Sequence, residues 1–153
     1  MRKIPEISSL LGYSDCGKLD LDALVSVRIF GGKTVEQAFE YICSGKECDY
    51  VFLESFHFMN SNAFWFYFPI FKKYLLWDTQ KNKEVDIIVI KASIQFLLKQ
   101  KSEIFSHLTE VIALIKILEK LIPMIKIEYS FEIAIIKEIK FNIEYLKKYL
   151  SNF

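Results

Sequence analysis

The last third of the chain carries two runs in which apolar residues recur every three or four positions. Steps of 4, 3, 4, 3 and 4 join the apolar positions of residues 104–122, and similar steps follow through residues 135–150. Such spacing gathers apolar side chains on one side of an α-helix. We predict a helix over about 102–122, capped by Ser102 and ended by Pro123, and a second helix along residues 135–150.

The preceding segment, residues 84–100, fits two patterns. Val85–Ile90 is rich in β-branched residues, which favour a strand. However, Ile87, Ile90, Ile94 and Leu97 are also spaced as one helical face, and no turn residue interrupts the run. The length of the apolar run favours a helix.

The N-terminal third shows signals for helix ends. A helix capped by Asp20 or Asp22 is expected to run through Phe30 and to end at Gly31-Gly32. Thr34-Val-Glu-Gln37 matches a capping box, and Gly45 stands where a helix to about Ser44 would end. Another helix is predicted over Cys48–Phe56.

Aromatic residues are concentrated in residues 50–77, which hold 12 of the 24 in the chain. We predict a helix capped by Asn60 or Ser61, running to Trp77 and kinked or broken near Pro69. Because Phe64–Phe68 are consecutive aromatics, no single neighbouring helix can cover them all. This segment is therefore either central and surrounded, or partly an exposed binding face.

Together these patterns predict an all-α protein. All five glycines lie in the first 45 residues, and a long tract without glycine favours helices joined by short polar turns. The length of 153 residues suits one domain. We predict a single compact multi-helix domain over residues 1–153, with about seven helices and the last three packed in a bundle-like layer.

Charge and composition exclude some classes of function. The net charge is +1, and only Arg2 and Arg28 are arginines, which disfavours a nucleic-acid binder. The longest stretch without charge, Ser55–Phe71, is too short and too polar to span a membrane. No signal-peptide core follows Met1, and three cysteines are too few for a disulfide scaffold. We predict a cytoplasmic protein with reduced thiols.

Candidate chemistry is sparse. Gly31-Gly-Lys-Thr34 is similar to the end of a phosphate-binding loop, but Val27 occupies the place of the required first glycine. Four possible zinc ligands are present, Cys16, Cys43, Cys48 and His57, without the paired spacing of a zinc ribbon or finger. His107 lies between Glu103 and Glu110, and we predict that its side chain is exposed to solvent on a helix. We predict no metal, no cofactor and no catalytic group.

Residues 58–71 resemble a segment of small uncharacterised bacterial cytoplasmic proteins. In those proteins an "AFxYYLPxF"-like stretch follows a short helix; the matching positions here are Ala63, Phe64, Tyr67, Pro69 and Phe71. Phe30-Gly-Gly-Lys-Thr34 is similar to a turn in the same proteins, so the resemblance covers residues 20–77. Some proteins of this kind resemble immunity proteins. The resemblance implies structural roles for the aromatics and a function in toxin neutralisation.

The sequence thus favours binding over catalysis. We predict a bacterial immunity protein that neutralises a cognate toxin by occluding it. A local run of negative charge, Glu47, Asp49 and Glu54, is our candidate for the contact with a basic toxin. Two alternatives stay open: a small enzyme that uses a cysteine with a histidine, and an apolar-ligand binder that uses the aromatic segment.

Overall fold

Helices make up all the regular structure that can be described. The computed structural model describes residues 3–11, 23–47, 50–82 and 84–152, and within these ranges it contains α-helices, short 3-10 helices and no strand. The predicted all-α class is confirmed. The chain divides into two compact units, residues 1–74 and 75–153, which are described separately below. The single domain stays a prediction.

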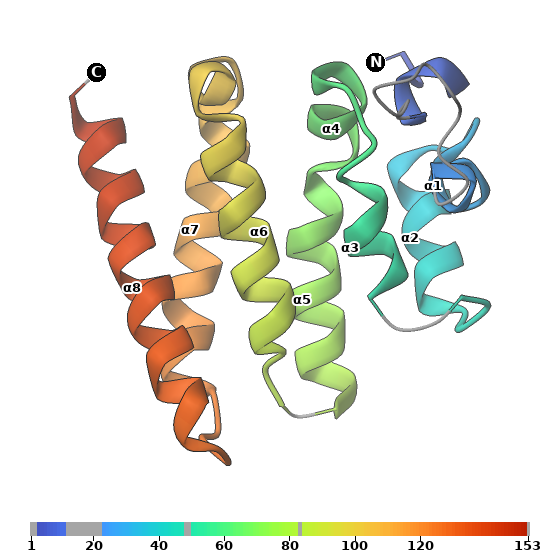
Figure 1. The fold of residues 1–153 in the computed structure, drawn as a ribbon. Helices are drawn as coiled ribbons and strands as arrows, with labels where there is room; N and C mark the ends of the chain where they lie inside the picture. The colour runs from blue at the N-terminus through green and yellow to red at the C-terminus, as the bar shows by residue number, and fades with distance from the viewer. Residues whose placement is uncertain (1–2, 12–22, 48–49, 83, 153) are drawn as a thin grey trace. The chain divides into compact units, whose positions relative to one another are not determined.

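The first unit is built from short helices (Figure 1). Their ends are set by glycines, caps and a proline rather than by long amphipathic repeats. In chain order they are η1 (Ile7–Leu10), α1 (Ala23–Phe30), α2 (Val35–Cys43), α3 (Val51–Ser55), α4 (Ser61–Tyr67) and the beginning of α5 (Pro69–Asn82).

The turn between α1 and α2 follows the predicted signals. Gly32 takes a φ of +67°, a left-handed conformation that glycine adopts without strain. Thr34 then caps α2: its hydroxyl accepts a bond from the Gln37 N–H at 3.2 Å, and the Gln37 side chain accepts one from the Thr34 N–H at 2.9 Å. The Gly-Lys-Thr sequence is therefore a helix stop and a capping box. The caps proposed at Asp20 and Asp22 lie outside the described residues.

The helix predicted over Cys48–Phe56 is shorter than expected. Gly45 has a φ of +68° just after α2, as predicted, but α3 begins only at Val51. Tyr50, the residue before it, has a φ of +71°. A continuous helix through Tyr50 is wrong, because its left-handed conformation cannot continue within a right-handed helix. The first two residues of the predicted helix, 48 and 49, lie outside the described residues.

The aromatic segment folds as two helices that meet at Pro69. The Asn60 side chain caps α4 by accepting a bond from the Ala63 N–H at 3.0 Å. The α4 helix ends at Tyr67, and α5 starts at Pro69, which has no N–H to continue the ladder of α4. The break near Pro69 is thus confirmed, while α5 runs on to Asn82, beyond the predicted end at Trp77.

Most rings of this segment lie in the core of the first unit. The Phe56 ring has its centroid 4.5 Å from that of Phe71 and 5.5 Å from that of Phe30. Phe64 packs edge-on against Phe56 at 5.8 Å. With 3.6 residues per turn, successive side chains of α4 point in different directions around the helix, so that neighbours on several sides bury their rings. Of the two interpretations, the central, surrounded segment holds for these buried residues: Phe52, Phe56, Phe64, Trp65, Tyr67, Phe68, Phe71 and Tyr74.

Tyr67 ties the end of α4 to the turn after α1. Its side chain is fully buried, and its hydroxyl lies 2.7 Å from the carbonyl oxygen of Phe30 and 2.8 Å from that of Lys33. The hydroxyl has one proton to donate to these two acceptors. Burial raises the pKa of Tyr67 to about 12, because a phenolate here would lose its hydration.

We expect this tyrosine to make stability fall at high pH. The folded pKa of about 12 lies above the ordinary value of 10.0, so the stabilisation is complete below pH 10 and is lost as the pH rises toward 12. At about 1.4 kcal/mol per pKa unit, the loss approaches roughly 3 kcal/mol. Urea unfolding from pH 8 to 12 measures it against Tyr67→Phe, which is expected to be about 1–3 kcal/mol less stable at pH 8. Parallel pH profiles of the two proteins would contradict this role.

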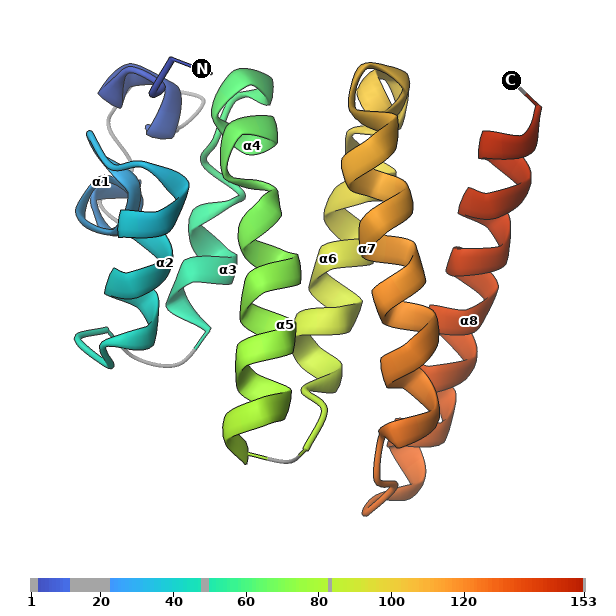
Figure 2. The same ribbon diagram turned by 180° about the vertical axis from the view of Figure 1, so that it is seen from behind.

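The second unit contains the longer helices (Figures 1 and 2). In both views the last α-helix lies at the edge of this unit, and the two α-helices before it overlap, one in front of the other. The last helix contacts the first of these two and pairs with the second through Lys147 and Glu119, as expected for a bundle-like layer. After the remainder of α5, the elements are α6 (Ile87–Lys99), η2 (Lys101–His107), α7 (Leu108–Leu121), η3 (Ile122–Met124) and α8 (Ser130–Ser151).

Local caps decide how these helices begin. The Asp86 side chain accepts bonds from the N–H groups of Ile88 at 2.9 Å and Val89 at 3.2 Å, so residues 87–90 open α6 rather than form a strand. The helix predicted from Ser102 is wrong at its start, since residues 101–107 form a 3-10 helix and the α-helix begins at Leu108. Pro123 lies beyond the end of α7, as predicted.

Candidate functional site

The acidic residues proposed from the sequence as the partner contact differ in their exposure and in their pairing. The Glu47 carboxylate is partly buried, lies 3.2 Å from Nε of Arg28 and accepts a bond from the Tyr41 hydroxyl at 3.1 Å. The pKa of Tyr41 is raised, by burial first and then by this hydrogen bond. Glu54 is exposed on α3, and Asp49 lies outside the described residues. Since Arg28 pairs with Glu47, Glu54 is the more accessible of the two described carboxylates.

The proposed metal and nucleophile groups are only partly described. Cys43 is partly buried in α2 and His57 is exposed after α3, while Cys16 and Cys48 lie outside the described residues. His107 precedes the first turn of α7. Within the described ranges, no three His, Cys, Asp or Glu side chains come together as metal ligands.

A third feature, which sequence analysis did not select, is the apolar outer side of α8. Phe141 is 72% exposed in the middle of this helix, although Ile139 and Ile143, two residues before and after it, are buried. Phe131 near the start of α8 is 61% exposed, and Tyr145 is exposed one turn after Phe141. Large exposed apolar side chains that recur along one element mark interaction surfaces.

One line of α8 residues forms what we call the outer stripe: Ala134, Lys137, Phe141, Tyr145 and Lys148. Successive members are separated by 3, 4, 4 and 3 residues, so they follow one side of the helix for about 21 Å, at 1.5 Å per residue. All five are exposed. The buried residues Ile139, Ile143 and Leu146 occupy the opposite side.

The acidic and basic residues of α8 differ in how they are paired. Each acidic residue of the helix is engaged within the second unit. Glu132 accepts bonds from the N–H groups of Glu128 and Tyr129 at 2.7 and 2.9 Å. Glu138 lies 3.2 Å from the Lys91 ammonium of α6, and Glu144 lies 3.1 Å from that of Lys147.

The lysines of α8 are engaged less often. Lys147 bridges Glu144 and Glu119 of α7, and these hydrogen bonds raise its pKa. In the described part of the chain, by contrast, Lys137, Lys140 and Lys148 form no ion pair. The outer stripe therefore combines an aromatic centre with two uncompensated positive charges.

The Tyr145 ring, a member of the outer stripe, is contacted on one side by Lys101. The Lys101 ammonium lies 4.7 Å from the centroid of its ring and 4.4 Å from that of Tyr149, and it also donates a hydrogen bond to the Tyr145 hydroxyl. Phe105 packs on Tyr149 at 5.5 Å. These contacts fix the orientation of an exposed tyrosine, which lowers the entropy that it loses on binding a partner.

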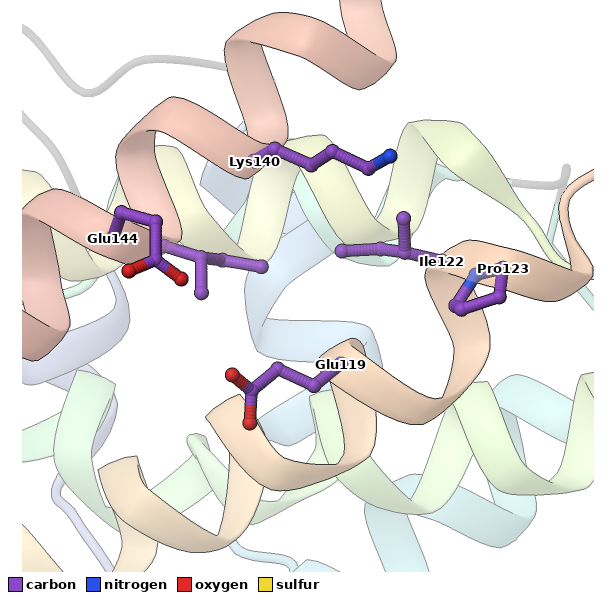
Figure 3. Close-up of a pocket in the computed structure, with 6 residues that line it drawn as sticks. Glu119, Ile122, Pro123, Lys140 and Glu144 are labelled. Atoms are coloured by element: carbon purple, nitrogen blue, oxygen red, sulfur yellow. The ribbon is translucent and has the colours of Figure 1, made fainter.

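A shallow pocket of about 260 Å³ opens between the end of α7 and α8. Ile122, Pro123 and Ile143 give it an apolar lining, with the Glu119 and Glu144 carboxylates on one side and Lys140 on the other (Figure 3). Ligand pockets usually enclose about 300–1,000 Å³. This pocket is smaller and open, so its size suits one side chain of a partner.

Comparison with known proteins adds no relative. No protein-family model, no curated protein and no solved structure matches the chain. Among the described residues, no helix combines the length and the apolar character that crossing a bilayer demands. The candidate site is thus defined by its own geometry, and the outer stripe of α8 is its strongest element.

Proposed function

We propose that the protein is a non-catalytic binding protein, a bacterial cytoplasmic immunity protein that neutralises a cognate toxin by covering it. The observation that carries the binding role is the aromatic outer stripe of α8, centred on Phe141 at 72% exposure. Aromatic residues are enriched among the few side chains that dominate protein–protein affinity. The toxin as partner is supported by the resemblance of residues 20–77 to immunity-like proteins.

Occlusion fits the shape of this surface. A helix at the edge of its unit can lie across a partner without rearrangement of its own core (Figure 2). The rings of the 50–77 segment, proposed above for an apolar ligand, are largely core. That burial leaves less exposed aromatic surface for the ligand-binding alternative, which therefore has weaker support than the binding role of α8.

Coexpression with the toxin domain encoded beside the gene tests this function. We expect cells that produce both proteins to survive and the two proteins to coelute in gel filtration. Cells that produce the toxin domain alone serve as the unprotected control. Death of cells that contain the intact protein, with no complex in gel filtration, would refute the proposal.

A further inference from the structure

The charges of α8 indicate what kind of surface covers it. The helix engages its three carboxylates within the second unit but leaves Lys137 and Lys148 exposed on the outer stripe, without ion pairs among the described residues. Phe141 lies between these lysines, one turn after Lys137 and two turns before Lys148. A surface that covers Phe141 must therefore approach two uncompensated ammonium groups.

We propose that the outer stripe binds an acidic amphipathic helix of the partner protein, an inference that rests on the proposed function and specifies its contact. The charge requirement follows from complementarity, since burying Lys137 and Lys148 against neutral or basic groups would cost their hydration without compensation. The helical form is the geometry that the face accommodates, since ridges of residues 3 and 4 apart fit the grooves of a neighbouring helix.

The anchors of this contact are Phe141 and Tyr145. Phe141 supplies an exposed apolar ring, and Lys101 holds the Tyr145 ring in place from η2. Ala134 at the start of the stripe is small, so a partner backbone can approach there. Apolar residues of the partner helix pack between Ala134 and Tyr145, and its Asp or Glu residues reach Lys137 and Lys148.

The partner surface proposed here is acidic, whereas Glu47, Asp49 and Glu54 led us to expect a basic toxin surface. A second copy of this chain is disfavoured as the occupant, because two outer stripes facing each other would bring lysines together. An anionic membrane could supply negative charge but not the 3-and-4 spacing of side chains. These alternatives are outcomes of the following experiment.

The test uses two labelled 18-residue helical peptides with leucines spaced by 3 and 4 residues. One carries glutamates beside the leucines, and its isomer carries lysines at those positions. Fluorescence anisotropy at about 0.1 M salt is expected to show that the intact protein binds the glutamate peptide at least tenfold more tightly. The double variant Lys137→Glu, Lys148→Glu should bind the glutamate peptide about tenfold more weakly, or weaker still. Added salt should weaken the binding of this peptide to the intact protein.

A matched control changes the same charge elsewhere. Lys116→Glu with Lys120→Glu alters two exposed lysines of α7 that form no described ion pair, and it should bind the glutamate peptide nearly as well as the intact protein. Four results would each overturn the inference: tighter binding of the lysine peptide, an equal loss in the control, a dimer in sedimentation that Phe141→Asp dissolves, or binding to phosphatidylglycerol vesicles in preference to the peptide.

The two proposals can fail separately. If the toxin complex forms and persists with Lys137→Glu and Lys148→Glu, the acidic-helix contact is wrong and the neutralising function stands. If no toxin complex forms while the glutamate peptide binds the outer stripe, the contact stands and the toxin as partner is wrong.

Discussion

Replacing Phe56 with alanine is expected to lower the free energy of unfolding of the first unit by about 3–5 kcal/mol. The Phe56 ring is buried and contacts the rings of Phe30, Phe64 and Phe71. Its removal leaves a cavity among three helices and the start of α5, which can close only in part because the neighbouring rings also pack on each other. The midpoint of urea unfolding, followed by near-ultraviolet circular dichroism, measures the loss.

Phe66→Ala is the matched control for this substitution. Phe66 lies in the same aromatic run but is only partly buried, and its ring packs edge-on against Tyr67 at 4.8 Å. We expect it to cost clearly less, about 1 kcal/mol. Equal losses for the two variants would mean that the core of the first unit is not centred on Phe56.

The second large effect concerns binding rather than stability. Phe141→Asp is expected to weaken the complex with the toxin domain at least about 30-fold, the effect of losing an interface hot spot of 2 kcal/mol or more. Its own unfolding free energy should change by no more than about 0.5 kcal/mol, since Phe141 is exposed. Calorimetric titration gives the affinity, and urea unfolding gives the stability.

Ile88→Asp provides the comparison on another helix. Ile88 is an exposed apolar residue in the first turn of α6, outside α8, where an added carboxylate suits the helix dipole. This variant should retain the affinity of the intact protein. An unchanged complex with Phe141→Asp, or the same loss with Ile88→Asp, would remove the outer stripe from the interface.

The sequence predicted elements best where a single local rule decides the backbone. Thr34 and Gln37 form their capping box, Gly32 and Gly45 take positive φ, and the chain breaks at Pro69, because each signal acts within a few residues. Periodicity misplaced the start of α7, since a 3-10 helix with Ile104 buried satisfies the same apolar spacing at its boundary. The left-handed Tyr50 had no sequence signal, because tyrosine rarely adopts that conformation.

The candidate site was harder to predict than the fold. Glu47, Asp49 and Glu54 were selected by local negative charge, and only tertiary structure shows that Arg28 pairs with Glu47. The outer stripe had a signal in the sequence: Phe141 and Tyr145 lie off the apolar face formed by Ile139, Ile143 and Leu146. What the sequence could not indicate is that the carboxylates of α8 find partners within the second unit while Lys137 and Lys148 do not.

Crosslinking from position 141 itself tests most directly whether the outer stripe of α8 contacts the partner. A photoreactive benzoylphenylalanine is placed there, and in a second protein at position 88, and each is irradiated with the toxin domain. We expect a covalent adduct from position 141 and none from position 88. An adduct from position 88 alone, or from neither position while the complex is intact, would show that α8 does not contact the partner through its outer stripe.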